Sequence, residues 1–281
     1  IYDDPQNDLS LETRERDLQL VGFLNQAARA LQTVSNRRQE LALAGRVQAN
    51  LLPDAPPQIP GWEIAATWRP ARETSGDFYD FIPLPGGRVG LVIADVVDKG
   101  MGAALLMALS RTLLRTYAPE HASHPERLLR VVNQRIIADI HAGLFLTLFY
   151  GVLDPSTGEL TYSNAGHPPP YLFLPGEEQA VEALHRTGMP VGISNTGKWE
   201  TVTIHIPPGA LLLLYTDGIS EAQNPHGEFF GGAHIQNVVH AHRGGFASEI
   251  QDSLISSAVA FSGPSPQLDD ITLMVLIREN Q

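Results

Sequence analysis

Four short segments place aspartates where an apolar run meets a turn of small residues. The segments are Ser75-Gly76-Asp77-Phe78-Tyr79-Asp80, Ala94-Asp95-Val96-Val97-Asp98-Lys99-Gly100, Tyr215-Thr216-Asp217-Gly218 and Leu268-Asp269-Asp270-Ile271-Thr272. Carboxylates that a fold brings together at the mouths of strands repel one another and resist ionisation. A fold that gathers these aspartates therefore needs a cation, and this need constrains the chain more than any other feature.

The available ligands indicate which cation this is. The chain has no cysteine, so disulfides, thiolate zinc sites and a cysteine nucleophile are all excluded. Ligand sets made only of oxygen favour a hard ion, Mg²⁺ or Mn²⁺, over zinc. The aspartates therefore point to metal-assisted hydrolysis.

The charge balance limits the partners. Acidic residues number 31 against 19 basic ones, which gives a net charge of −12. Nucleic acids and anionic membranes both require a basic surface, so this balance disfavours them. No apolar run approaches the ~18–20 residues needed to span a bilayer. We expect a cytoplasmic protein with no nucleic-acid or membrane partner.

Residues 1–53 are predicted to form an N-terminal linker helix, helical over 13–52 and ended by Pro53. Apolar residues follow the 4-3-4-3 spacing of a coiled coil at Leu20, Leu24, Ala27, Leu31 and Val34. This spacing predicts a helix that forms a homodimer, and the alternative is a helix packed on its own domain. Because the chain opens at Ile1 without an initiator Met, we expect a piece of a longer protein or a processed protein. The linker helix has no other evident role, so we expect a sensor domain before it.

Residues 54–281 show the pattern of an α+β domain. Short apolar runs bounded by Gly, Pro and Asn predict strands at 63–68, 89–95, 145–153, 159–163, 171–174, 201–206, 211–215 and 271–277. Amphipathic spacing predicts helices at 101–117, 125–141, 233–242 and 246–261. Runs of strands interrupted by paired helices are typical of an antiparallel sheet core covered by helices.

From Arg46 to the C-terminus, the order and spacing of motifs resemble the metal-dependent protein phosphatases of type 2C. The resemblance is narrower to the bacterial branch of sporulation and sigma-factor-regulating serine phosphatases. Besides the aspartate segments, it rests on Arg46-Val47-Gln48-Ala49-Asn50-Leu51-Leu52-Pro53, Pro70-Ala71-Arg72-Glu73-Thr74, Ser163-Asn164-Ala165-Gly166-His167-Pro168-Pro169 and Ile219-Ser220-Glu221-Ala222. It implies a sandwich of two antiparallel β-sheets flanked by α-helices, with two Mn²⁺ or Mg²⁺ ions in a cleft at one end.

The resemblance also implies which residues hold the metals. By motif position the ligands are Asp77, Asp95, the backbone oxygen of Val96, Asp217 and Asp269. Asp95 would bridge the two ions, and Asp270 is a reserve ligand at a position that is Asn in eukaryotic relatives. Two such ions sharing a water would lower its pKa and provide a nucleophile for a phosphorus centre.

Three positions depart from the eukaryotic pattern. Val97 stands where those relatives have a histidine proposed as general acid, and Phe78 where they have a phosphate-binding arginine. The general acid and the phosphate-binding group are therefore unassigned. His167 occupies a position that is acidic in those relatives, and we expect it either at the edge of the site or stabilising a turn.

The resemblance implies a serine/threonine protein phosphatase of a bacterial signalling or stress-response pathway. Its expected substrate is a phosphorylated anti-anti-sigma-type regulator, and an upstream sensor or activator protein would control it. In this branch the helix after Gly100 is expected to couple the N-terminal helix to the metal site. Two alternatives remain open, namely a catalytically silent binding scaffold and a hydrolase of a small phospho-metabolite.

Overall fold

The computed structural model describes residues 26, 29–140, 143–176 and 181–280. The chain divides into two compact units, Ile1–Ala44 and Gly45–Gln281. In the first unit the described residues are helical, as predicted, and Leu31 and Val34 are exposed. Leu20, Leu24 and Ala27 of the predicted coiled coil lie outside the described residues. The dimer and the predicted division after residue 53 stay predictions.

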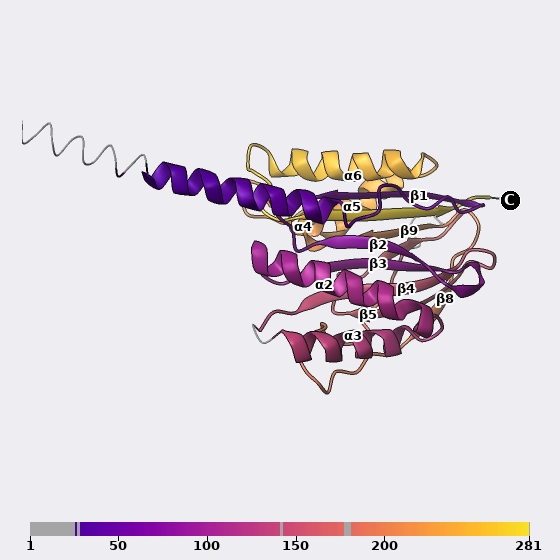
Figure 1. The fold of residues 1–281 in the computed structure, drawn as a ribbon. Coiled ribbons are helices and arrows are strands. Elements are labelled where there is room, and N and C mark those ends of the chain that lie inside the picture. Colours follow the sequence, from indigo (N-terminus) through magenta and orange to yellow (C-terminus); the bar gives the residue numbers. More distant parts are fainter. Residues whose placement is uncertain (1–25, 27–28, 141–142, 177–180, 281) are drawn as a thin grey trace, which may run out of the picture. The chain divides into compact units, whose positions relative to one another are not determined.

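The second unit contains two five-stranded sheets, shown in Figure 1. The first sheet has the order β1 (Trp62–Arg69), β10 (Ile271–Arg278), β9 (Leu211–Tyr215), β6 (Tyr171–Phe173), β7 (Val181–Ala183). The second has the order β2 (Phe78–Pro83), β3 (Val89–Val96), β4 (Leu146–Asp154), β5 (Glu159–Ala165), β8 (Val202–His205). Every pair of neighbouring strands is antiparallel. The predicted sandwich of antiparallel sheets is confirmed.

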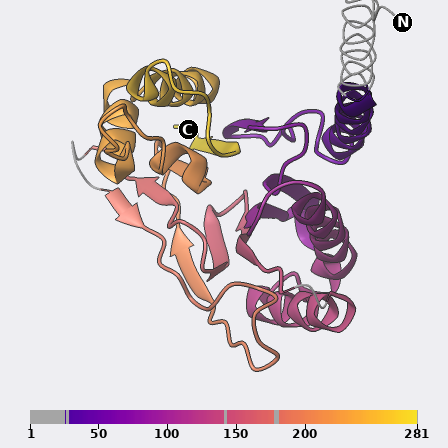
Figure 2. The ribbon, with the colours of Figure 1, turned by 90° about the vertical axis from the view of Figure 1, so that its left-hand side faces the viewer.

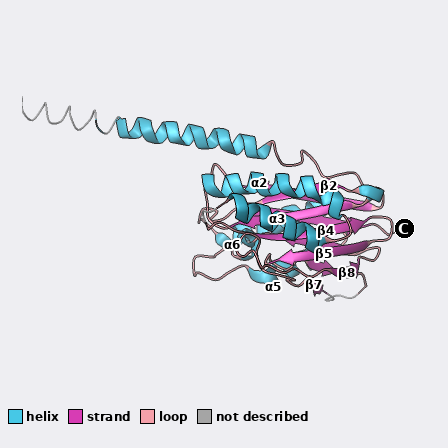
Figure 3. Ribbon diagram, turned by 60° about the horizontal axis from the view of Figure 1, so that its bottom comes forward, coloured by secondary structure: helices cyan, strands magenta, loops and turns pink. Residues whose placement is uncertain are grey.

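Helices cover the outer face of each sheet. On the second sheet lie α2 (Met101–Tyr117) and α3 (Pro125–Asp139), and on the first lie α5 (Gly231–Ala241) and α6 (Ala247–Ser262). The end-on view of Figure 2 and the view of Figure 3 show the strands between these two pairs of helices. A short helix, α4 (Asp217–Ser220), follows β9. Among the described residues, no helix is both long enough and apolar enough to cross a bilayer.

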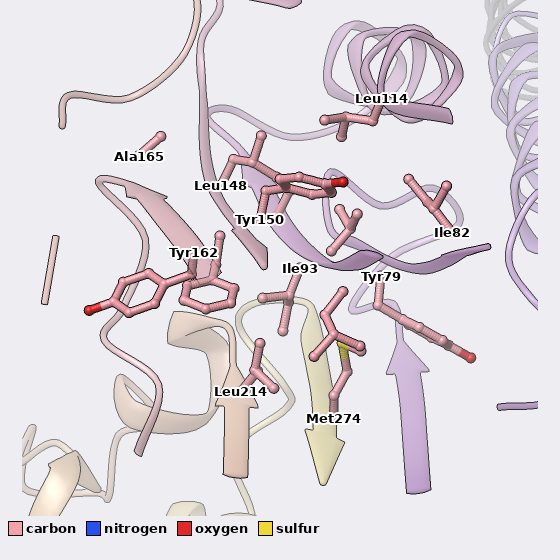
Figure 4. Packing of buried hydrophobic residues seen from close by; sticks show 14 of the residues in the cluster. Tyr79, Ile82, Ile93, Leu114, Leu148, Tyr150, Tyr162, Ala165, Leu214 and Met274 are labelled. Atoms are coloured by element: carbon pink, nitrogen blue, oxygen red, sulfur yellow. The ribbon is translucent and has the colours of Figure 1, made fainter. Parts of the chain in front are cut away.

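Alternating side chains of β9 and β10 build two layers of core. Leu212, Leu214 and Met274 point between the sheets, where Figure 4 shows Leu214 and Met274 near Ile93 of β3. Leu213 and its alternate neighbours pack instead under α5 and α6. Because successive side chains of a strand point to opposite faces, a strand buried on both faces is apolar at every position, as β9 is.

Two strands and three 3₁₀ or short α-helical turns were not predicted from the sequence. The turns are α4, η1 (Pro85–Gly87) and η2 (Ala118–His121). The edge strand β7 has three residues, which is too short for a periodic signal. Strand β2 was missed because the charged Asp80 interrupts its apolar run, although this carboxylate is buried.

An ion cluster explains how β2 can bury Asp80. Arg111 Nε lies 3.0 Å from one carboxylate oxygen and Arg115 Nη1 lies 2.8 Å from the other, and both arginines belong to α2. Burial raises the pKa of Asp80, while the hydrogen bond from Arg115 and the charge of Arg111 oppose this rise. The cluster therefore ties α2 to the strand that follows Asp77.

Replacing Asp80 with alanine should destabilise the fold. The change leaves the largely buried Arg111 without its counter-charge, which typically costs about 3 kcal/mol or more. Urea unfolding measures this loss, with Asp252→Ala on the exposed surface of α6 as the matched control. A loss equal to that of the control would show that apolar packing alone holds α2.

Candidate active site

Strand pairing brings the four aspartate motifs to one end of the sandwich. Phe78 pairs with Ala94, so Asp77 before β2 lies beside Asp95 near the end of β3. In the other sheet Tyr215 at the end of β9 pairs with Leu273 near the start of β10. Asp217 and the Asp269-Asp270 pair therefore flank neighbouring strand ends.

Two hydroxyl groups join the halves of this site. Thr216 Oγ1 donates to Asp77 Oδ2 at 2.6 Å, and Thr272 Oγ1 donates to the same oxygen at 2.9 Å. The backbone N–H of Thr272 also donates to Thr216 Oγ1 at 3.0 Å. A side-chain hydrogen bond also links Asp77 to Asp95, in which the protonated carboxyl of Asp77 donates and the carboxylate of Asp95 accepts. The carboxyl of Asp77 is thus held from both sheets at once.

Gly76 allows a close approach of the backbone of β3. A Cβ at Gly76 would lie 2.9 Å from the carbonyl oxygen of Val96, closer than real Cβ atoms come to such an atom. The carbonyl that the sequence predicts as a backbone ligand therefore lies against the turn that carries Asp77. Trp68 supports this turn, because its indole Nε1 donates to the carbonyl of Asp77 at 2.9 Å.

The two adjacent acidic residues of the last motif have different surroundings. Asp270 is buried, and it accepts hydrogen bonds from the N–H of Ala71 at 2.7 Å, the hydroxyl of Ser75 at 2.7 Å and the N–H of Gly76 at 3.0 Å. Asp269 is 43% exposed and lies 2.9 Å from the Nζ of Lys99. Asp270 thus supports the turn before Asp77, while Asp269 faces the open edge of the site.

Burial and mutual repulsion disfavour the charged forms of these carboxyls. Burial raises the pKa of Asp95 to about 7, and the charges of Asp217 and Asp269 add to the rise. Burial also raises the pKa of Asp217 to about 6, with Asp269 and Glu221 contributing and Lys99 opposing. The pKa of Asp77 is raised well above its usual value by burial and then by Asp95. A divalent cation would relieve this repulsion.

The donor set fits a hard metal ion. The cluster offers carboxylate oxygens and a backbone carbonyl, the ligands that Mg²⁺ and Mn²⁺ accept. Across residues 29–140, 143–176 and 181–280, no three Asp, Glu or His side chains are already arranged around one point as metal ligands. Both threonine hydroxyls donate to Oδ2 of Asp77. Lys99 pairs with Asp269, so a metal ion bound to Asp269 would compete with Lys99 for this carboxylate.

His167 lies one strand beyond Asp95. Its Nδ1 is 2.9 Å from the hydroxyl of Thr147, the residue of β4 that pairs with Asp95. The side chain is fully buried, which lowers its pKa to about 3 and keeps the ring neutral. The backbone N–H of His167 donates to the side chain of Asn164 at 2.9 Å, which stabilises the turn. A direct role at the edge of the site stays a prediction.

Gln48 is a supporting residue that the sequence analysis did not single out. Its Nε2 donates to the carbonyl of Ser75 at 2.8 Å, and the N–H of Ser75 donates back to its Oε1 at 3.1 Å. Thr216, Thr272 and Lys99 were missed in the same way. All four stand inside quoted motifs, so polar residues within these motifs were the available signal.

Replacing Gly218 with alanine should disturb the site. A Cβ at this position would overlap the backbone carbonyl of Asp270, so α4 and the last motif must separate. Overpacking of this kind costs about 1–3 kcal/mol, and we also expect weaker Mn²⁺ binding. Thermal unfolding and calorimetric titration with Mn²⁺ measure the two effects. Gly102→Ala in α2 is the control, because Gly102 has no positive φ and only Leu144 Cδ1, at 3.6 Å, lies within 4 Å of its Cβ position. Equal stability and affinity of the two variants would contradict the close approach.

The pH dependence of the metal-free protein should reflect the raised pKa of Asp95. A carboxyl with a folded pKa of about 7 and an unfolded value near 4 binds more protons in the folded state. Its contribution to stability is therefore full below about pH 4 and is lost as the pH rises to about 7.

Urea unfolding of the protein in EDTA, from pH 5 to 8, tests this dependence. The Asp95→Asn variant should lose less stability over that range than the unchanged protein, by on the order of a few kcal/mol. Saturating Mn²⁺ should remove the difference in slope, because metal ligands bind deprotonated. Parallel curves without metal would contradict the raised pKa.

Comparison with known families gives a match over most of the chain. The family model described as Stage II sporulation protein E (SpoIIE) matches residues 85–279. Protein IcfG of Synechocystis is 34% identical over 86% of the chain, and the chain spans 42% of IcfG. Phosphoserine phosphatase RsbU of Bacillus subtilis is 28% identical over 86% of the chain, which spans 71% of RsbU.

Solved structures agree with the fold. The SiaA-PP2C domain of Pseudomonas aeruginosa superposes with a TM-score of 0.77 at 20% identity, over 88% of this chain and 99% of that domain. At this identity the similarity establishes the architecture alone. It matches the two sheets and flanking helices described above.

Proposed function

Because the chain belongs to the Stage II sporulation protein E (SpoIIE) family, we propose that it is a Mn²⁺- or Mg²⁺-dependent phosphatase that hydrolyses phosphoserine or phosphothreonine in a protein. Family membership confirms the resemblance to type 2C phosphatases that the motifs predict, and the fold agrees with it. The observation that supports the activity best is the cluster of carboxyls with raised pKa values at one end of the sandwich.

We assign the metals to Asp77, Asp95, the backbone oxygen of Val96, Asp217 and Asp269. Bound ions of this kind activate a water and neutralise charge on phosphoryl oxygens. The hydroxyls of Thr216 and Thr272 orient Asp77. Asp270 is assigned a positioning role, because its two oxygens are occupied by the loop from Ala71 to Gly76.

The chain's own groups also prepare the site for a phosphate. Lys99 brings a positive charge to the edge of the cluster, where its side chain is 35% exposed. A cation in this position attracts a doubly charged phosphate ester by long-range electrostatics. Phe78 is fully buried in β2, so it does not replace the phosphate-binding arginine of eukaryotic relatives.

The substrate class is proposed from the relatives. RsbU is named a phosphoserine phosphatase, and we propose a phosphorylated anti-anti-sigma-type regulator as the substrate here. We further propose that an upstream sensor or activator acts through the N-terminal helix, which would dimerise. The exposed Leu31 and Val34 of that helix support a partner, since apolar side chains at coiled-coil spacing seek one.

Hydrolysis of p-nitrophenyl phosphate and of a phosphoserine peptide tests the activity. With Mn²⁺ we expect turnover of both, loss of both in EDTA, and a decrease on the order of a hundredfold or more in Asp95→Asn, because even residues that only support ligands contribute 10–100-fold. Asp252→Asn, on the exposed surface of α6, is the matched control.

Other outcomes of this experiment would favour the alternatives. Turnover confined to small phospho-metabolites would indicate a metabolite hydrolase. Absence of both turnover and calorimetric Mn²⁺ binding would indicate a phosphatase-like scaffold and would contradict the proposal. Binding of Mn²⁺ without turnover would indicate that an activator is required.

A further inference from the structure

An apolar pocket lies directly beside the carboxylate cluster. It has a volume of about 360 Å³ and lies between the C-terminal part of α6, the segment after α4 and the loop before β10. Its apolar lining comes from Ala222, Ala258, Val259, Pro266, Leu268 and Ile271. Asp269 and Gly218, the neighbour of Asp217, line the pocket as well. The pocket and the cluster therefore share a wall.

Two large apolar side chains of this pocket are exposed. Leu268, in the loop before β10, is 60% exposed, and Val259 of α6 is 57% exposed. Grouped apolar side chains that remain exposed, with polar residues at their rim, mark sites of interaction. Because this pocket lies beside the carboxylate cluster, we infer that the interaction involves the substrate.

The loop that forms the shared wall is held in place by hydrogen bonds. Gln267 Nε2 donates to the carbonyl of Arg69 at 2.9 Å and to that of Asp269 at 2.7 Å. Lys99 Nζ donates to the carbonyl of Leu268 at 2.8 Å. The side chain of Leu268 is thus presented on a fixed backbone. A prearranged surface of this kind costs little entropy to bind.

The rim of the pocket is acidic. Glu221 and Asp269 both line it, and the charge of Glu221 contributes to the raised pKa of Asp217. A ligand with its own carboxylates at this rim would be repelled. The occupant is therefore expected to be apolar and to have no acidic group beside its apolar part.

We propose that this pocket binds an apolar side chain that lies within two residues of the phosphoserine in the substrate protein. The inference rests on the proposed function, which places the phosphoserine at the carboxylate cluster. An extended segment advances about 3.3 Å per residue, so a neighbouring side chain reaches a pocket that shares Asp269 with the cluster. The pocket thus selects among phosphoproteins, while the carboxylates act on the phosphate common to all of them.

Two fluorescent phosphoserine peptides provide the test. One has leucine at the two positions on each side of the phosphoserine, and the other has serine at those positions. Binding to the Mn²⁺-loaded protein is measured by anisotropy, and hydrolysis is measured separately with p-nitrophenyl phosphate as a substrate without flanking residues. We expect the leucine peptide to bind about tenfold more tightly, since one buried leucine accounts for that factor.

Val259→Glu places a carboxylate in the pocket and should abolish the preference for leucine. Ala260→Glu is the matched control, since Ala260 is the next, exposed residue of α6 and does not line the pocket. The control should keep the preference. Hydrolysis of p-nitrophenyl phosphate shows in the same samples whether each variant retains an intact site.

Equal binding of the two peptides, or a preference that persists in Val259→Glu, would overturn the inference. An apolar small molecule that fills the pocket without weakening binding of the leucine peptide would also overturn it. A preference that depends on Val259, found together with neither hydrolysis nor calorimetric Mn²⁺ binding, would support the docking pocket and contradict the catalytic proposal. The two proposals can therefore fail independently.

Discussion

Repulsion among buried carboxyls is the constraint on which this structure depends. Asp77, Asp95 and Asp217 come from three strand ends in two sheets. Beyond the effect of burial, the charge of Asp217 raises the pKa of Asp95, and the charge of Asp95 raises that of Asp77. Such a cluster persists only where the rest of the fold is stable enough to hold it. The two layers of core and the pairing of β2 with β3 and of β9 with β10 supply that stability.

Backbone geometry at three turns determines how closely the aspartate motifs approach one another. Gly76 and Gly218 stand where any side chain would meet a carbonyl of another motif, that of Val96 or that of Asp270. Asp98 has a φ of 76°, a left-handed conformation uncommon outside glycine, and its side chain accepts from the N–H of Lys99 at 2.8 Å. This turn directs Lys99 toward Asp269. The absence of a side chain at Gly76 and Gly218 thus allows the carbonyls of Val96 and Asp270 to lie against the turns that carry Asp77 and Asp217.

Short-range periodicity and residue types predict eight of the strands and an antiparallel sheet core covered by helices. The two-sheet sandwich and the convergence of the aspartate motifs follow from the resemblance to type 2C phosphatases. The sequence does not predict the partners of Asp77, since Thr216 and Thr272 lie 139 and 195 residues away along the chain. Strand β2 was also not predicted. Burial of Asp80 depends on ion pairs with Arg111 and Arg115 of α2, and the local sequence around Asp80 does not indicate these long-range contacts. The ligand assignments rest on motif position and stay predictions.

The last turn of the N-terminal helix belongs to the same compact unit as the site. A Cβ at Gly45 would overlap the carbonyl of Glu73, and Gln48 exchanges two hydrogen bonds with Ser75. Ser75 in turn donates to Asp270 and accepts from the N–H of Asp77. A shift of this helical turn would therefore change the support of a ligand aspartate. The predicted coupling between the N-terminal helix and the metal site has a physical route through these contacts.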